Sequence, residues 1–286
     1  MKRMLFTLAA ITIFAGCCRK AVNMEEKNEM VQTLVKPDDV LAHINLTVAE
    51  GKRLIAEGIA NDEMVKARLT SGMIIITRGT TNTYIAERLA GLTAPRGSFI
   101  TGHIVPVGSP GINVERTTEI VLLNGIPTSM SYEEALQKMA PGDIIFKGAN
   151  LLNYSKQQAA VNIGSSDGGT TARLRPFVGE GKGQFIVPIG LEKDCSWDLV
   201  TLEATYGGDN ARENEVPKLW VHQNARIYTE IEALHTLAGV NAFPIAAGGI
   251  AGREGGITLI IAGSKAQVEK AFAVVAGIRG EKPFVE

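Results

Sequence analysis

The chain is poor in cysteine. Three of its 286 residues are cysteines, and two of these, Cys17 and Cys18, stand near the start, which leaves only Cys195 in the rest. One cysteine cannot build a disulfide framework, so none is expected. Basic runs and aromatic clusters are missing as well, and the formal net charge is −1. This composition argues against nucleic acid as a partner.

Histidine is also scarce, with four residues in the chain. His103, His222 and His235 are scattered and do not have the spacing of metal ligands, so we expect structural roles for them. No motif in the sequence indicates a bound cofactor. The sequence therefore predicts neither a metal site nor an organic cofactor.

The N-terminal segment has the pattern of a secretory signal sequence. Lys2 and Arg3 precede an apolar run over residues 4–14, and small residues lead to Cys17. The run is too short to span a bilayer. The segment resembles a bacterial lipoprotein signal, which implies a lipidated Cys17 that anchors the protein in the cell envelope.

A second interpretation of this segment stays open. The codons of Arg19 and Lys20 can resemble a ribosome-binding sequence, and Met24 stands a few codons downstream. Met24 and the residues after it resemble the start of an ordinary cytosolic protein. Translation from Met24 would give a cytoplasmic protein. On either interpretation, residues 1–30 are a leader that takes no part in the fold.

The bulk of the chain predicts an α/β protein. Its length allows one large or two small domains, and its 31 glycines indicate many tight turns. Short β-branched runs alternate with helical patterns, which is typical of a largely parallel, doubly wound sheet. We predict that residues 37–195 form this core. Its strands are expected at 73–76, 98–106, 119–123, 143–146 and 184–189, and its helices at 37–69 (in two pieces, with a capping box at Thr47 and Glu50) and 131–139.

The last third changes character. Residues 196–286 are predicted to form a C-terminal α+β unit, with strands at 199–204 and 219–222. From residue 225 the order strand, helix, strand, strand, helix is part of a ferredoxin-like unit. Exposed strands of such units pair between subunits, so we expect a homo-oligomer. A glycine-rich stretch at 246–256 joins two of the strands.

The most informative stretch follows the strand at 73–76. A small polar loop stands there before a helical pattern begins. Backbone N–H groups at a helix start lack intrahelical partners, and the helix dipole favours negative charge there, so this order predicts an anion site. The alternative is an ordinary capped helix. The loop consists of Arg78, Gly79, Thr80, Thr81, Asn82 and Thr83.

Two further loops are predicted to meet this one, because ligands of such sheets bind beyond the carboxyl ends of the strands. Lys147 follows a buried strand and is a candidate to bind a phosphate or carboxylate group of a ligand. The alternative is a solvated lysine at the end of a strand. Asp167 is a candidate base, although Asp-Gly is also a common turn. The two loops contain Lys147, Gly148, Ala149 and Asn150, and Asp167, Gly168, Gly169, Thr170 and Thr171.

The order of these motifs resembles a known superfamily. It is similar to ribose-5-phosphate isomerase A, to the effector domains of DeoR-type regulators, and to CoA-transferase-like proteins, which share a Rossmann-like core. The resemblance implies binding of a sugar phosphate or related anion. It is carried by Lys-Arg-Leu-Ile-Ala at 52–56, Gly-Thr-Thr-Asn-Thr at 79–83, Ile-Ala-Glu-Arg-Leu at 85–89, Phe-Lys-Gly-Ala-Asn at 146–150, Gly-Gly-Thr-Thr at 168–171 and Glu192-Lys193.

The chain departs from this pattern where the catalytic carboxylates belong. Asn150 and Leu151 stand where the isomerases have acidic residues, and Arg175 falls near their catalytic glutamate. Aldose–ketose isomerisation needs a carboxylate base, for which Asp167 and Glu192 are the remaining candidates. We expect a protein that binds, and isomerises or transfers, a small phosphorylated or carboxylated metabolite. The alternatives are a non-catalytic binding protein on this fold and an envelope-anchored solute-binding lipoprotein.

Overall fold

The computed structural model describes residues 34–102, 104–165, 167–179, 182–206 and 217–284. The leader 1–30 with Cys17 and both candidate starts, and His103, lie outside these residues. No helix in the described part is long and apolar enough to cross a membrane. The compartment and the oligomeric state stay predictions.

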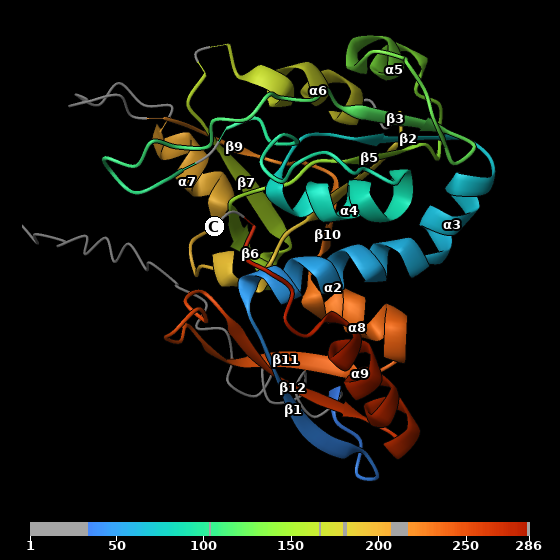
Figure 1. Cartoon of the computed structure of the whole chain (residues 1–286), viewed down its shortest axis with the longest axis vertical. Coiled ribbons are helices and arrows are strands. Elements are labelled where there is room, and N and C mark those ends of the chain that lie inside the picture. The colour runs from blue at the N-terminus through green and yellow to red at the C-terminus, as the bar shows by residue number, and fades with distance from the viewer. Residues whose placement is uncertain (1–33, 103, 166, 180–181, 207–216, 285–286) are drawn as a thin grey trace, which may run out of the picture.

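A mixed six-stranded sheet forms the centre of the molecule (Figure 1). Its parallel part has the order β10-β8-β5-β2, and β3 and β4 continue it antiparallel beyond β2. The prediction of an α/β protein is thereby confirmed, but the sheet is mixed because its last two strands form a hairpin. The strands are β2 (Met73–Ile76), β3 (Ile120–Leu123), β4 (Ile126–Pro127), β5 (Ile144–Phe146), β8 (Gln184–Pro188) and β10 (Ala225–Tyr228).

Helices cover both faces of this sheet. On one face α2 packs against α4 and α8, and α5 and α6 lie on the other (Figure 1). All four residues of β2 are buried, as expected for an apolar strand between two helical layers. The chain leaves β2 into α4 on one face and reaches α6 on the other face after β5. The helices are α2 (Val48–Asn61), α4 (Thr80–Ala90), α5 (Tyr132–Lys138), α6 (Gly169–Gly179) and α8 (Glu230–Ala238), and α3 (Glu63–Thr70) connects α2 to β2.

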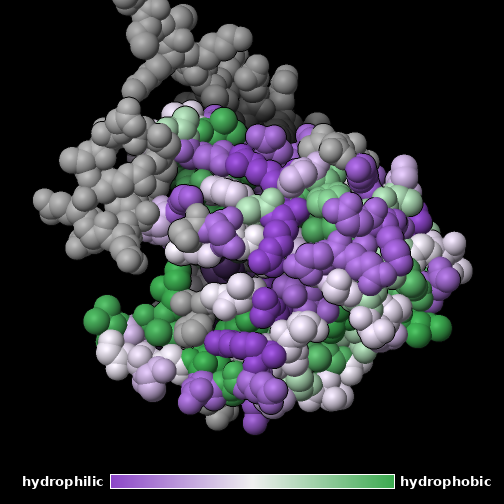
Figure 2. Space-filling model, turned by 90° about the horizontal axis from the view of Figure 1, so that it is seen from above, coloured by the Kyte–Doolittle hydropathy of each residue, from purple (hydrophilic) through white to green (hydrophobic). Residues whose placement is uncertain are grey.

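Two smaller antiparallel sheets complete the fold. One has the order β1-β12-β11 and packs against α9; the other has the order β6-β7-β9 and packs against α7. In Figure 2 hydrophilic residues prevail over the coloured surface on the α5–α6 side, and hydrophobic ones form small separate groups. The elements are β1 (Val40–Leu46), β6 (Leu151–Asn153), β7 (Gln158–Ile163), α7 (Leu199–Tyr206), β9 (Lys218–Val221), β11 (Asn241–Ala247), β12 (Ile257–Gly263) and α9 (Lys265–Ile278).

The predicted order of elements from residue 225 is found, as β10, α8, β11, β12 and α9. These strands do not share one sheet, however. β10 joins the six-stranded sheet, whereas β11 pairs with β12, and β12 pairs with β1 from the other end of the described chain. Hydrophobic periodicity identifies a strand but does not identify its partner.

Three predicted elements are wrong. Residues 40–46, expected to be helical, form β1, in which Ile44 and Leu46 face the core. Residues 98–102 and 104–106 form no strand, although Phe99 is buried and its carbonyl oxygen accepts from the amide of Gly79 at 3.0 Å. Residues 199–204 belong to a helix, α7. Short apolar runs do not distinguish a strand from a buried helix or a packed loop.

Candidate functional site

The start of α4 is open. Gly79 occupies the N-cap position in an extended conformation, with φ 172°, and among the described residues no side chain caps the first turn. The first N–H groups of a helix have no intrahelical acceptor, and the positive end of the helix dipole lies there. The predicted loop therefore has the backbone geometry that an anion requires.

Two of the polar side chains in this loop are used by the fold. The hydroxyl of Thr83 donates to the carbonyl oxygen of Gly79 at 2.9 Å. The amide of Asn82 donates to the carbonyl oxygen of Thr77 at 2.8 Å. Thr80 and Thr81 differ, because no hydrogen bond of their hydroxyls is found within the described residues. Of the predicted loop donors, these two hydroxyls are available to a ligand.

Asn82 also presents an acceptor without a donor. Its side chain is fully buried, and its Oδ1 atom has no hydrogen-bond partner in the described part of the chain. A buried polar atom left without a partner costs about 1–3 kcal/mol. A donor from a ligand or from a bound water would remove this cost.

Lys147 carries the unpaired charge of the site. It directly follows β5, its side chain is half-buried, and its ammonium makes no hydrogen bond or ion pair among the described residues. Burial lowers the pKa of Lys147 to about 8, although the charge of Glu119 raises it. Glu119 is itself paired with Arg78, whose Nε donates to it at 3.0 Å. A net positive charge therefore remains at the end of β5.

His222 connects the second loop to the third. Its Nε2 lies 3.3 Å from the carbonyl oxygen of Gly148, and the side chain lines a cavity of about 30 Å³ together with Thr171. Burial, and then the charge of Lys147, lower the pKa of His222 to about 3. The ring is therefore neutral at pH 7. The structure thus brings the predicted loops at 147–150 and 168–171 close together.

The surroundings of Asp167 are those of a residue that stabilises a turn. It is exposed, and its carboxylate accepts from the Ser165 hydroxyl at 2.5 Å and from the Gly169 amide at 2.8 Å. The hydrogen bond from Ser165, and then that from Gly169, lower the pKa of Asp167. A carboxylate with a lowered pKa is a weak base, and this geometry is that of a turn that opens α6.

The remaining predicted residues shape the loops. Asn150 accepts from the amide of Asn162 at 2.8 Å and so closes the β6–β7 hairpin, next to the half-buried Ala149. Gly168 has φ +78°, and a Cβ there would come within 2.6 Å of the Trp220 ring. Thr170 is buried, and its carbonyl oxygen accepts from the Tyr132 hydroxyl at 3.3 Å.

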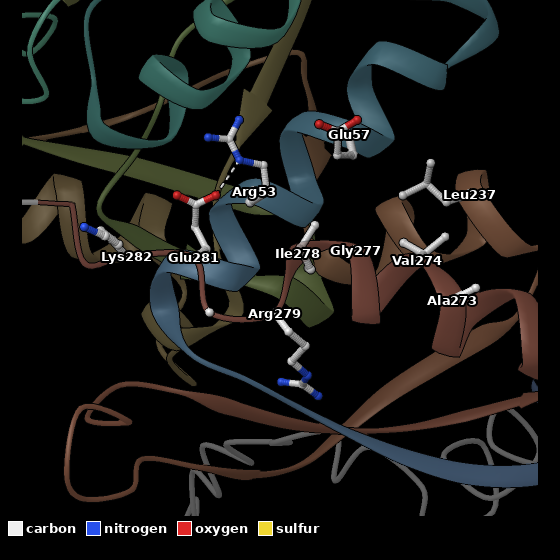
Figure 3. Close-up of a pocket in the computed structure, with 11 residues that line it drawn as sticks. Arg53, Glu57, Leu237, Ala273, Val274, Gly277, Ile278, Arg279, Glu281 and Lys282 are labelled. Atoms are coloured by element: carbon white, nitrogen blue, oxygen red, sulfur yellow. Dashed lines mark hydrogen bonds and ion pairs between the residues drawn. The ribbon is translucent and has the colours of Figure 1, made fainter.

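A larger cavity than the one beside His222 lies elsewhere. It measures about 550 Å³ and is bounded by α2, α8, α9 and the chain that follows α9 (Figure 3). Its charged groups, apart from the exposed Lys282, already have partners: Arg53 is bonded to Glu281, Glu57 to Arg88, and Arg279 to Glu50. No group of three potential metal ligands is found in the described residues. The open helix start and the unpaired lysine make the edge of the sheet the better candidate site.

Comparison of the chain with known proteins does not assign it to a family. Neither a protein-family model, nor a curated protein, nor a solved structure matches this chain. The resemblance to isomerases, DeoR effector domains and CoA-transferases stays a prediction. The assignment of a function must come from the site itself.

Proposed function

We propose that this protein binds a small anionic metabolite, phosphorylated or carboxylated, where β2 and β5 end. The observation that carries the proposal is Lys147, a half-buried ammonium without an anionic partner at the end of β5. Burying a charge without a counter-charge is costly, and folds retain such groups where a ligand supplies the partner.

The topology supports the same place. The connections from β2 and β5 lead to helices on opposite faces of the sheet (Figure 1). In open α/β sheets, ligands bind in the crevice that such a divergence leaves beyond the carboxyl ends of the strands. The start of α4 and Lys147 directly follow these two neighbouring strands, at the place where such a crevice is expected.

The parts have separate roles in the proposal. The N–H groups and hydroxyls of Thr80 and Thr81 donate to the anion, and Lys147 supplies the charge. Asn82 holds the first turn of α4 against the ends of β2 and β5 through its side-chain amide. Arg78 is engaged by Glu119 and sets the wall of the crevice.

The side chains support binding of the anion without a catalysed reaction. The predicted base Asp167 lies exposed with a lowered pKa, and Glu119 is held by Arg78. Neither carboxylate is free to move a proton between two carbons of a bound sugar phosphate. We therefore propose a ligand-binding role in preference to isomerisation or transfer at this crevice.

A thermal-shift titration tests the proposal. Ribose 5-phosphate and inorganic phosphate should raise the Tm of the wild type, whereas ribose should not, because binding stabilises the folded state by mass action. Thr81→Asp should abolish the shift through like-charge repulsion. Gln137→Glu, which adds the same charge on the exposed face of α5, should retain it. Equal shifts for Thr81→Asp and the wild type, or none for either phosphate probe, would overturn the proposal.

A further inference from the structure

A second group of ionisable side chains meets at the same edge of the sheet, where β8 and β10 end. Lys52 comes from α2, Glu192 and Lys193 from the turn after β8, and Glu230 is the first residue of α8. None of them belongs to the loops of the proposed anion crevice. These side chains lie on three separate elements, so their meeting cannot be predicted from the sequence.

Glu230 is placed with precision. It is 2% exposed, and its Oε2 accepts from the amide of Leu191 at 3.0 Å. Its other oxygen lies against Gly51, where an added Cβ would come within 2.6 Å of it. The glycine thus lets the carboxylate approach α2 directly beside Lys52. Burial, and then the charge of Glu192, raise the pKa of Glu230.

Lys52 is the unpaired member of this group. Its ammonium makes no hydrogen bond or ion pair in the part of the chain that the structure describes, and it lies 5.7 Å from the ring centroid of Phe284. The two carboxylates nearby are engaged, since Glu192 pairs with Lys193 and Glu230 accepts from a backbone amide. A lysine that only stabilised the fold would be expected to take one of these carboxylates as its partner.

The surroundings of Lys52 favour the free amine form of its side chain. Burial, and then the charge of Lys193, lower its pKa to about 8, while the charges of Glu192 and Glu230 raise it. A lysine with a lowered pKa has a larger fraction of free amine near neutral pH, which is the form that attacks a carbonyl carbon. The raised pKa of Glu230 favours the protonated acid that the same reaction consumes.

We propose that Lys52 is the nucleophile of a second site that forms a Schiff base with a small aldehyde or ketone, with Glu230 as the proton donor. The amine nitrogen attacks the carbonyl carbon, the C–N bond forms, and a proton moves from nitrogen to oxygen to give a carbinolamine. Glu230 then protonates the hydroxyl, the C–O bond breaks and water leaves. The products are a protonated imine on Lys52, water and the Glu230 carboxylate, so atoms and charge balance.

Reductive trapping tests this site. The full chain is incubated at pH 7.5 with propanal, an uncharged probe, and sodium cyanoborohydride, and labelled lysines are located by peptide mass spectrometry. Lys52 should be labelled roughly tenfold faster than the exposed Lys265. A lysine whose pKa is about 8, as for Lys52, has far more free amine at this pH than a lysine of ordinary pKa. Lys52→Arg should lose this label, and Lys147→Arg, which alters the anion crevice, should retain it.

Two further measurements complete the test. Glu230→Gln should slow the labelling of Lys52 several-fold while circular dichroism shows an intact fold. In the wild type, labelling of Lys52 should reach a plateau above about pH 8, whereas lysines of ordinary pKa react faster up to about pH 10.4. Labelling of Lys52 no faster than that of Lys265, or a pH profile like that of ordinary lysines, would overturn the proposal even if Glu230→Gln failed to fold.

Discussion

The side-chain amide of Asn82 donates to the carbonyl oxygen of Phe146 at 3.2 Å, which joins the first turn of α4 to the last residue of β5. The same carbonyl oxygen accepts from the hydroxyl of Thr77 at 2.9 Å. Lys147 is the next residue in the chain. The open helix start and the unpaired ammonium are therefore held at a fixed separation by hydrogen bonds between two parallel strands.

Asn82→Ala should weaken the connection between the first turn of α4 and the end of β5. The substitution removes the donor from the carbonyl oxygens of Thr77 and Phe146, so we expect a loss of about 1–3 kcal/mol in the free energy of unfolding, measured by denaturant titration. Anion binding should weaken with it. Asn61→Ala is the matched control, because Asn61 donates once, to the carbonyl oxygen of Glu57, at the end of α2. A loss no larger than that of the control would contradict the role given to Asn82.

Lys147→Met should separate stability from binding. Methionine fills a similar volume and removes a half-buried charge that has no partner, so the free energy of unfolding should stay the same or rise by about 1 kcal/mol. The thermal shift with phosphate probes should disappear. Lys138→Met on the exposed face of α5 should change neither by more than about 0.5 kcal/mol. A large loss of stability in Lys147→Met would show that the ammonium has a structural partner.

The affinity for the anion should depend on pH through Lys147. Its pKa in the free protein is about 8, set by burial and opposed by Glu119, with the neutral His222 nearby. A bound anion favours the protonated ammonium, so binding takes up a proton once the pH exceeds 8, and the affinity should fall by up to about tenfold per pH unit above it. Lys147→Arg keeps its charge and should show no such fall in a calorimetric titration.

The stability of the protein should fall in mild acid because of His222. Its pKa is about 3 in the folded protein, depressed by burial and by the charges of Lys147 and Arg175, and near 6.5 when unfolded. Below pH 6.5 the unfolded state binds a proton that the folded state does not bind. The free energy of unfolding should therefore fall by up to about 1.4 kcal/mol per pH unit. Between pH 6.5 and 5, His222→Gln should flatten this slope, and the exposed His235 should be replaceable by glutamine without effect.

The sequence predicted those parts of the fold that depend on neighbours in the chain. The capping box of Thr47 and Glu50 is present, and Asn124 and Gly125 form the predicted turn, with φ of 51° and 77°. β2, the loop and α4 follow one another as expected because one apolar run and one helical pattern define them. These features need no knowledge of distant residues.

Most features that the sequence does not predict depend on residues far apart in the chain. The strand β1 pairs with β12, which lies more than 200 residues away, so its local pattern does not identify it as a strand. The role of Asn82 depends on Phe146, and the surroundings of Lys52 depend on Glu230. Asp167 is different, because its partners Ser165 and Gly169 are near in the sequence, but a local pattern of Asp and Gly suits both a turn and a catalytic base.

Two carboxylates hold the chain after α9: Glu50, which accepts from Arg279 and from the amide of Gly280, and Glu281. Glu281 accepts from Arg53 at 2.8 Å, as Figure 3 shows, and from Arg96 at 2.6 Å, and both guanidinium groups lie within 4.7 Å of the Tyr84 ring centroid. The side chain of Glu281 is 16% exposed, so solvent screens these pairs less than surface ones.

Glu281→Gln would leave Arg53 and Arg96 with Glu87 as the one carboxylate that both share among the described residues. We expect a loss of about 1–3 kcal/mol in the free energy of unfolding, and faster amide hydrogen exchange in residues 279–284, because charge-assisted hydrogen bonds become neutral ones. Glu269→Gln removes an exposed pair with Lys265 at 3.9 Å and should cost less than about 0.5 kcal/mol. Equal losses in the two variants would show that the pairs of Glu281 are as weak as surface pairs, and unchanged exchange would show that other contacts hold this segment.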